Sequence, residues 1–217
     1  MRRRITKRRS VVLLSGGLDS TVSATIAAKR TRPLFALTFD YGQRAARMEI
    51  RAARTISKAL RIPHKTVKIP FFKTFKNIAL LRSQKKPSAQ SLSRIHNVWV
   101  PNRNGLFINI AACYAEHHRV DLIVTGFNRE EAEQFPDNTP QFIAAINHSL
   151  MFSTLRNVKV VSFVSDYTKA QIYRLGLRYR APLQHIYSCY LGRTAMCGKC
   201  ASCRRLQKSM QHDVQHS

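Results

Sequence analysis

The chain has 217 residues and a hydrophobic content of 44%, enough for one compact domain to bury its own core without disulfides. No apolar run approaches the roughly 20 residues that a membrane-spanning helix needs. The basic start, Met1 to Arg9, is followed by an apolar stretch of only four residues, 11–14, which argues against a signal peptide. These features predict a cytoplasmic protein that spans no membrane.

The net charge is the unusual feature. Lys and Arg number 37 against 11 Asp and Glu, which gives +26, and no acidic residue lies between Glu49 and Glu116. Such a chain attracts polyanions, so weak contact with RNA or DNA is one interpretation. The other is a compositional bias with no nucleic-acid partner. We favour the bias slightly, because the cations are spread along the chain and not gathered on one helix face. Residues 1–10 are the exception, a predicted basic tail.

Strand-like and helix-like segments alternate. Short apolar runs predict strands at 11–14, 34–40, 65–69, 121–126 and 158–164. Apolar residues at helical spacing predict helices at 19–30, 45–60, 103–118, 140–152 and 168–179. Residues 71–97 are basic and rich in Ser and Gln, and predict a long loop of the kind that forms lids or binding loops. Repeated β-α-β units predict an α/β fold of three layers, a mostly parallel sheet flanked by helices, with ligands at the carboxyl ends of the strands.

The segment after the first strand is the first chemical motif. Its sequence is Leu14-Ser15-Gly16-Gly17-Leu18-Asp19-Ser20-Thr21-Val22-Ser23-Ala24. Two glycines let the backbone approach a ligand closely, while hydroxyls and the N–H groups of a helix start attract anions. It is not a Walker A loop, because Gly-Lys-Ser/Thr is missing. A capped Ser-Gly turn is the simpler alternative, but the full motif directly after a buried strand favours a phosphate site.

This motif resembles the signature of the PP-loop ATP pyrophosphatase superfamily, whose members cleave ATP between the α and β phosphates and adenylate a substrate oxygen. The resemblance implies that residues 14–24 bind the nucleotide, with Ser15, Gly16, Gly17, Ser20 and Thr21 on the pyrophosphate. It implies that Asp19 orients the loop or its Mg²⁺. Residues 37–40, at the end of the second strand, would border the adenosine.

A four-cysteine cluster closes the chain. Cys189, Cys197, Cys200 and Cys203 are spaced as C-x7-C-x2-C-x2-C, which lets four thiolates wrap one tetrahedral metal. Zinc is favoured over an iron–sulfur cluster, because the Cys-Pro that follows in ferredoxin-type spacing is absent. Four thiolates leave no open position, so the zinc is expected to be structural. The remaining cysteine, Cys113, falls on an apolar helix face and is expected in the core. The chain is thus divided into a tail (1–10), a PP-loop domain (11–187) and a zinc knuckle with a C-terminal helix (188–217).

The combination of both motifs resembles the 7-cyano-7-deazaguanine synthase family of queuosine and archaeosine biosynthesis. Further matching segments are 39–44, 100–104, 126–132, 135–138 and 188–190. The resemblance implies ATP-dependent carbon–nitrogen ligation of 7-carboxy-7-deazaguanine with ammonia, through adenylated intermediates, to give 7-cyano-7-deazaguanine. We also expect a homo-oligomer, a dimer, with one zinc per chain as the cofactor and ATP with Mg²⁺ as the cosubstrate.

Five residues are the candidates for catalysis: Ser15, Asp19, Ser20, Arg103 and Asp137. Asp137 or Glu131 could accept a hydrogen bond from the deazaguanine ring, and Arg103 or Arg129 could pair with the substrate carboxylate or with phosphate oxygens. A loop cap or a surface ion pair is an equally good interpretation of each. Trp99 and Tyr41 are expected to serve packing more than base stacking.

Two other functions fit parts of the sequence. A PP-loop enzyme that acts directly on tRNA, a thiolation enzyme or a lysidine-type ligase, would suit the positive charge. A non-catalytic nucleic-acid-binding protein with a zinc knuckle would suit it too. The first lacks an appended RNA-binding domain here, and the second has no need of a pyrophosphate loop.

Overall fold

The computed structural model describes residues 7–81, 87–89, 92 and 95–214. Five strands form one parallel sheet in the order β3-β2-β1-β4-β5. They are β1 (Arg9–Leu13), β2 (Arg32–Asp40), β3 (His64–Lys68), β4 (Leu122–Thr125) and β5 (Lys159–Ser162). All five lie within or next to the predicted segments, so the predicted parallel sheet is confirmed.

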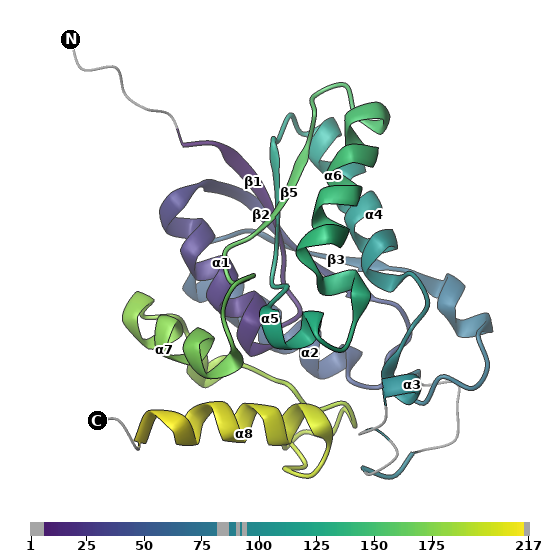
Figure 1. Ribbon diagram of the computed structural model, residues 1–217, viewed down its shortest axis with the longest axis vertical. Coiled ribbons are helices and arrows are strands. Elements are labelled where there is room, and N and C mark those ends of the chain that lie inside the picture. The colour runs from purple at the N-terminus through teal and green to yellow at the C-terminus, as the bar shows by residue number, and fades with distance from the viewer. Residues whose placement is uncertain (1–6, 82–86, 90–91, 93–94, 215–217) are drawn as a thin grey trace.

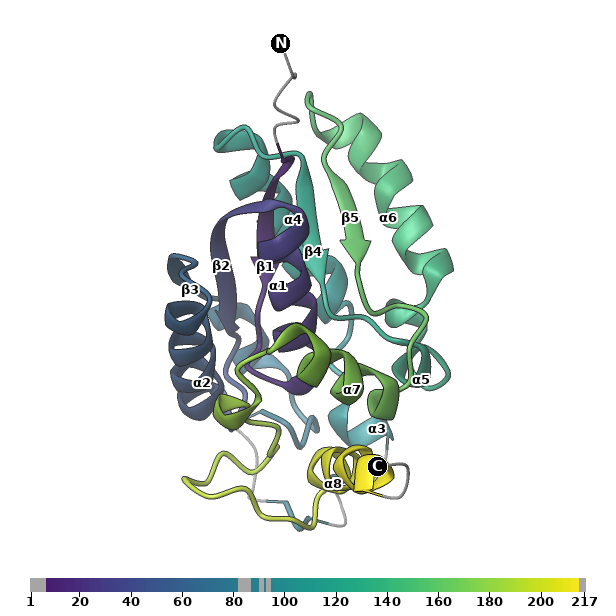
Figure 2. The same cartoon turned by 90° about the vertical axis from the view of Figure 1, so that its left-hand side faces the viewer.

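Helices cover both faces of this sheet (Figures 1 and 2). The longer ones are α1 (Leu18–Arg30), α2 (Ala46–Ala59), α4 (Arg103–His117), α6 (Pro140–Ser153), α7 (Lys169–Tyr179) and α8 (Ala201–Val214). Shorter turns are η1 (Pro70–Thr74), α3 (Ile95–Val98), α5 (Arg129–Ala132), η3 (Pro136–Asn138) and η4 (Leu183–His185). Within the described ranges, no helix is both long enough and apolar enough to cross a membrane.

Two hydrophobic cores lie on the two faces. Val12 and Leu14 pack with α1 and α2, while their neighbours Val11 and Leu13 face α4. This alternation follows from the period of two along a strand and explains why β1 reads as a continuous apolar run. Helix α7 packs on α1, and α8 packs on α7. The predicted three-layer architecture is therefore confirmed.

The sheet begins earlier in the chain than expected. Strand β1 starts at Arg9, inside the segment predicted to be a tail, and Ser10 is fully buried with its hydroxyl 2.7 Å from that of Thr31. Strand β2 includes Pro33, next to a register shift between Ser10 and Val11. Proline cannot donate to the ladder, so it is tolerated at such an irregularity. Of the predicted tail, residues 1–6 lie outside the described residues.

The first part of the predicted loop 71–97, residues 71–81, packs against the body of the domain, and the role of the loop as a lid or binding loop stays a prediction. Phe72, Ile78, Leu80 and Leu81 are buried in the core beneath α4, and Leu81 forms an antiparallel bridge with Gln43. The apolar residues scattered among the cations fix this segment to the body of the domain. Residues 82–86, 90–91 and 93–94 lie outside the described part.

The placement of Cys113 was also wrong: its side chain is exposed. Helix α4 instead turns a face of small residues toward the sheet, with Ala111, Ala112 and Ala115 buried beside Ile108. Small side chains let a helix approach a sheet closely. A prediction from large apolar residues at helical spacing does not recognise a face of alanines as the buried face. Cys113 is therefore a surface thiol.

The strand order creates a switch point between β1 and β4. The chain runs outward from β1 through β2 to β3 and then returns to the other side of β1 for β4 and β5. Loops leaving β1 and β4 thus depart to opposite faces, which opens a crevice at their carboxyl ends. The candidate site lies in this crevice.

Candidate active site

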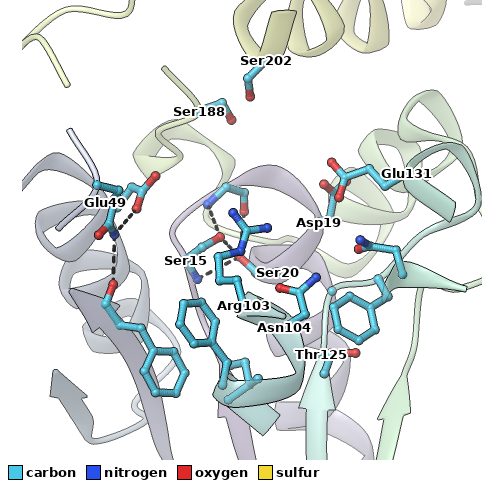
Figure 3. Close-up of a pocket in the computed structure, with 18 of the residues that line it drawn as sticks. Ser15, Asp19, Ser20, Glu49, Arg103, Asn104, Thr125, Glu131, Ser188 and Ser202 are labelled. Carbon is cyan, nitrogen blue, oxygen red and sulfur yellow. Dashed lines mark hydrogen bonds between the residues drawn. The ribbon is translucent and has the colours of Figure 1, made fainter. Parts of the chain in front are cut away.

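A cavity of about 260 Å³ occupies the crevice. Its walls come from the ends of β1, β2 and β4, from the start of α4 and α7, and from the segment that carries the cysteines. Figure 3 shows Ser15, Ser20 and Arg103 at the centre, Asp19 and Glu131 together on one side, and Glu49 on the other. Residues from positions 13 to 206 thus converge on one space.

The PP-loop forms the floor of this cavity. The Ser15 and Ser20 hydroxyls lie 3.0 Å apart, and the Ser20 hydroxyl also accepts the Ser15 N–H at 3.3 Å. Gly16 has φ +85° and packs so closely on α2 that a Cβ would lie 2.9 Å from Ala52 Cβ. Of the predicted nucleotide-binding residues, Leu14, Ser15, Gly17, Leu18, Asp19 and Ser20 line the cavity. Residues 21–24 are buried along α1 instead, where Ser23 donates to the Thr125 carbonyl.

Gly126 lets α1 begin at the mouth of the cavity. A Cβ on this residue would lie 2.7 Å from the backbone nitrogen of Ser20. We expect Gly126→Ala to destabilise the fold by about 2 kcal/mol, because backbone must move to admit the methyl group. Urea unfolding measures this. Gly17→Ala is the matched control, because its methyl would meet only side-chain oxygens at ordinary contact distance, Ser15 Oγ at 3.5 Å and Ser188 Oγ at 3.9 Å. Equal destabilisation by both variants would contradict the prediction.

A buried ion-pair triad forms one wall. The Lys169 ammonium lies 2.5 Å from Asp19 Oδ2 and 3.0 Å from Glu131 Oε1. Burial lowers the pKa of Lys169, but the two carboxylates more than offset it and raise that pKa overall. Lys169 is therefore a permanent cation. Two carboxylates share it, and burial raises the pKa of Asp19, whose second oxygen, Oδ1, is buried without a hydrogen-bond partner.

Lys169 is the main residue that the sequence analysis missed. It occupies the first position of α7, where the helix dipole disfavours a cation. Its backbone N–H is bonded to Glu130 Oε1 at 3.0 Å, and Thr168 and Gln171 form a capping box. A lysine in the first turn of a helix that follows a strand can be recognised in a sequence. It indicates a site with anions, because only nearby anions offset the unfavourable helix dipole.

Arg103 lies at the centre of the site in Figure 3. Its guanidinium donates to the Tyr41 hydroxyl at 3.3 Å and lies 5.8 Å from the centre of that ring. Burial raises the pKa of Tyr41 to about 12. Burial also raises the pKa of Asp137, which Arg103 opposes, and Asp137 accepts a hydrogen bond from Asn138 at 2.9 Å. The structure therefore brings Arg103 and Asp137 into the cavity with Asp19.

The opposite wall carries Glu49, which sequence reasoning did not select. Its Oε2 accepts a hydrogen bond from Gln43 at 2.8 Å, and burial raises its pKa. Arg129, by contrast, is exposed on α5 and does not line the cavity. Trp99 does line it, with its ring nearly parallel to that of Phe135 at 6.1 Å, so a residue expected only to pack is also part of the wall.

The four cysteines meet beside the cavity. Their sulfur atoms all lie within 4.8 Å of one another, so the cluster could hold a metal ion. Backbone N–H groups point at the sulfurs, with Cys197 N 3.4 Å from Cys189 Sγ and Cys200 N 3.3 Å from Cys197 Sγ. The cluster belongs to the same core as α1 and α2. Nearby Tyr190, Ser202 and Leu206 line the cavity.

A parallel sheet with this loop at its switch point defines the PP-loop class of ATP-using proteins. Solved structures share the fold. The U34-tRNA thiolase NcsA from Methanococcus maripaludis, a structure with its [4Fe-4S] cluster, has a TM-score of 0.55 and 15% identity, covering 97% of this chain and 67% of that one. NMN synthetase from Francisella tularensis has a TM-score of 0.51 and 16% identity, covering 97% and 87%.

Within this class the chain belongs to the family described as "Queuosine biosynthesis protein QueC", which matches residues 9–213. A relative from Carboxydothermus hydrogenoformans named 7-cyano-7-deazaguanine synthase is 46% identical over 209 residues, 93% of this chain and 97% of its own. Relatives of the same name from Bdellovibrio bacteriovorus and Methanosarcina barkeri are 43% and 34% identical, covering 96% and 94% of both chains.

Proposed function

We propose that this protein is an ATP-dependent carbon–nitrogen ligase that converts 7-carboxy-7-deazaguanine and ammonia into 7-cyano-7-deazaguanine. The observation that carries the proposal is family membership over nearly the whole chain, together with a PP-loop whose hydroxyls face a single cavity. A carboxylate is inert toward ammonia until one of its oxygens becomes a leaving group, and adenylation supplies that change.

The first half of the reaction activates the acid. A carboxylate oxygen attacks the α phosphorus of ATP, the bond to the β-phosphate oxygen breaks, and pyrophosphate leaves. Ser15 and Ser20 are proposed to hold the pyrophosphate, and the buried Arg103 to pair with the carboxylate or the phosphate. Ammonia then attacks the carbonyl carbon, AMP departs, and loss of a proton gives the amide.

The second half repeats the activation on the amide oxygen. A second ATP adenylates this oxygen and releases pyrophosphate. AMP then leaves with the oxygen as two protons leave nitrogen, and the carbon–nitrogen triple bond forms. Asp137 is proposed to accept a ring N–H of the deazaguanine, with Trp99 and Phe135 as the apolar wall beside it.

The acidic residues of the cavity suit a metal cation that would accompany the phosphates. Four of the chain's 11 acidic residues line it, Asp19, Glu49, Glu131 and Asp137, against the two cations Arg103 and Lys169. Mg²⁺ fits this donor set, because Asp19 Oδ1 is buried without a partner and two carboxylates share a single ammonium. Asp19 and Glu131 would hold the ion, which offsets charge on the phosphates when bound.

The four thiols fit a structural Zn²⁺. They close a tetrahedral set with no position left for substrate, and the N–H groups aimed at sulfur favour thiolates. We propose one zinc per chain, held by Cys189, Cys197, Cys200 and Cys203, and a homodimeric protein. The division into domain and knuckle at residue 188 remains a prediction.

Pyrophosphate release from ATP tests the proposal. The purified protein is supplied with ammonium, with and without 7-carboxy-7-deazaguanine, and the organic product is followed by mass. We expect release that depends on the acid and formation of the nitrile. Release triggered only by tRNA would instead support a tRNA-modifying enzyme. An absence of release under both conditions would contradict any enzymatic role.

A further inference from the structure

Helix α2 presents a row of cations to solvent. Arg47, Arg51, Arg54 and Lys58 are all exposed, at spacings of four, three and four residues. At 3.6 residues per turn they fall within about 60° of one another, on one stripe roughly 16 Å long. We call this stripe the α2 basic face.

No acid balances this stripe among the described residues. The single acid of α2, Glu49, faces the cavity and bonds Gln43. The described ion pairs join Arg156 to Asp121 and Lys169 to its two carboxylates, and none of them involves the α2 basic face. The positive charge of the stripe also acts on His64, on the adjacent strand β3. Burial lowers the pKa of His64, and Arg54 lowers it further.

Exposed cations also lie on α7 and α8, but the two edges of the sheet differ in charge, which the sequence analysis did not expect. Helix α2 lies by the edge strand β3, and α6 covers the opposite edge strand β5 (Figure 2). The 14 residues of α6 contain no Lys, Arg, Asp or Glu. A general bias toward basic residues would place cations on both exposed helices, so it does not explain this polarity.

We propose that the α2 basic face binds the phosphate backbone of nucleic acid. Along one strand of a nucleic acid a phosphate recurs about every 3.4 Å, so roughly five phosphates pass along a stripe of this length. An anionic membrane fits less well, because a membrane-bound helix inserts an apolar face. The apolar face of α2, with Met48, Ala52 and Ile56, is already buried against the sheet.

The test uses a fluorescein-labelled RNA of about 20 nucleotides, longer than a typical single-strand site, and fluorescence anisotropy at several salt concentrations. One variant combines Arg47→Gln, Arg51→Gln, Arg54→Gln and Lys58→Gln. The control variant removes four exposed charges elsewhere, through Arg174→Gln, Arg178→Gln, Arg180→Gln and Lys208→Gln. Both variants lower the net charge by four, so a difference in RNA affinity between them reflects where the charges lie and not the total charge.

We expect the α2 variant to bind RNA at least about tenfold more weakly than the unaltered protein, and its slope of log affinity against log salt to be smaller by about 3. The control variant should keep most of the affinity and most of the salt slope. Thermal melting of both variants reports folding, and RNA binding is read without any turnover. Equal weakening by the two variants, or no RNA binding by the unaltered protein at low salt, would overturn the proposal. So would binding to phosphatidylserine vesicles but not to RNA.

Discussion

Replacing Lys169 by methionine is expected to destabilise the protein by about 3–5 kcal/mol at neutral pH. Lys169 is 8% exposed and is the cation that Asp19 and Glu131 share, so the substitution leaves two carboxylates buried without it. Urea unfolding at pH 7 measures the loss. Lys58→Met, on the exposed face of α2, removes the same charge without burial and is expected to change stability by less than about 0.5 kcal/mol.

The pH dependence of the free energy of unfolding shows whether the lost ion pairs cause the destabilisation by Lys169→Met. Burial raises the pKa of Glu131, but Lys169, with smaller help from Arg205 and Arg103, more than offsets this effect, so the net pKa lies below the usual range. A carboxylate with a lowered folded-state pKa stabilises the fold above its unfolded-state pKa, and this stabilisation is lost as the pH falls through the folded-state value. Without Lys169, burial raises the pKa of both carboxyls above their unfolded values, and stability is then lost as the pH rises. The two proteins should therefore differ most near pH 7 and approach each other only as the pH falls through the lowered folded-state pKa of Glu131.

A second substitution separates charge from packing. Asp19→Asn added to Lys169→Met removes one of the two uncompensated carboxylates and is expected to restore part of the lost stability. Pyrophosphate release should still fall by about a hundredfold or more, because the wall beside the phosphates has lost its fixed charges. A pH-independent loss that Asp19→Asn does not reduce would show that Lys169 only fills space.

The features predicted from sequence depend on short-range signals. The apolar run at 11–14, the Ser-Gly-Gly-Leu-Asp-Ser turn and the cysteine spacing each lie within a few residues, where steric and metal-ligand rules apply directly. These rules are enough to identify the PP-loop and the cysteine cluster from the sequence, and in the structure both lie beside one cavity.

What was missed depends on contacts between distant segments. Lys169 and Asp19 are separated by 150 residues, and only the packing of α7 on α1 brings them together. Glu49 was overlooked because an acid in an amphipathic helix usually faces water. The sequence analysis expected no helix face to gather the cations, and the α2 basic face shows that this expectation is wrong for α2.

Replacing Cys200 by serine is expected to abolish metal binding and to destabilise the protein by about 4 kcal/mol or more, as loss of a structural metal usually does. For a chain of this length that lowers the melting temperature by roughly 10 °C. Cys200 is fully buried, and its sulfur belongs to the four that lie within 4.8 Å of one another. Metal analysis should give one zinc per chain before the change. Cys113→Ser is the matched control, because that thiol is exposed and outside the cluster.

The metal should also support the cavity. The thiols hold the first turn of α8, from which Ser202 and Leu206 line the cavity and Arg205 donates to the Tyr190 hydroxyl at 3.1 Å. At a temperature where Cys200→Ser is still folded, we therefore expect KM for the deazaguanine acid to rise more than kcat falls, since α8 loses its anchor while the PP-loop is unchanged. A brown protein that contains iron would contradict the zinc assignment. A Cys200→Ser variant with full metal content and unchanged KM would show that the cluster neither binds the ion nor positions α8.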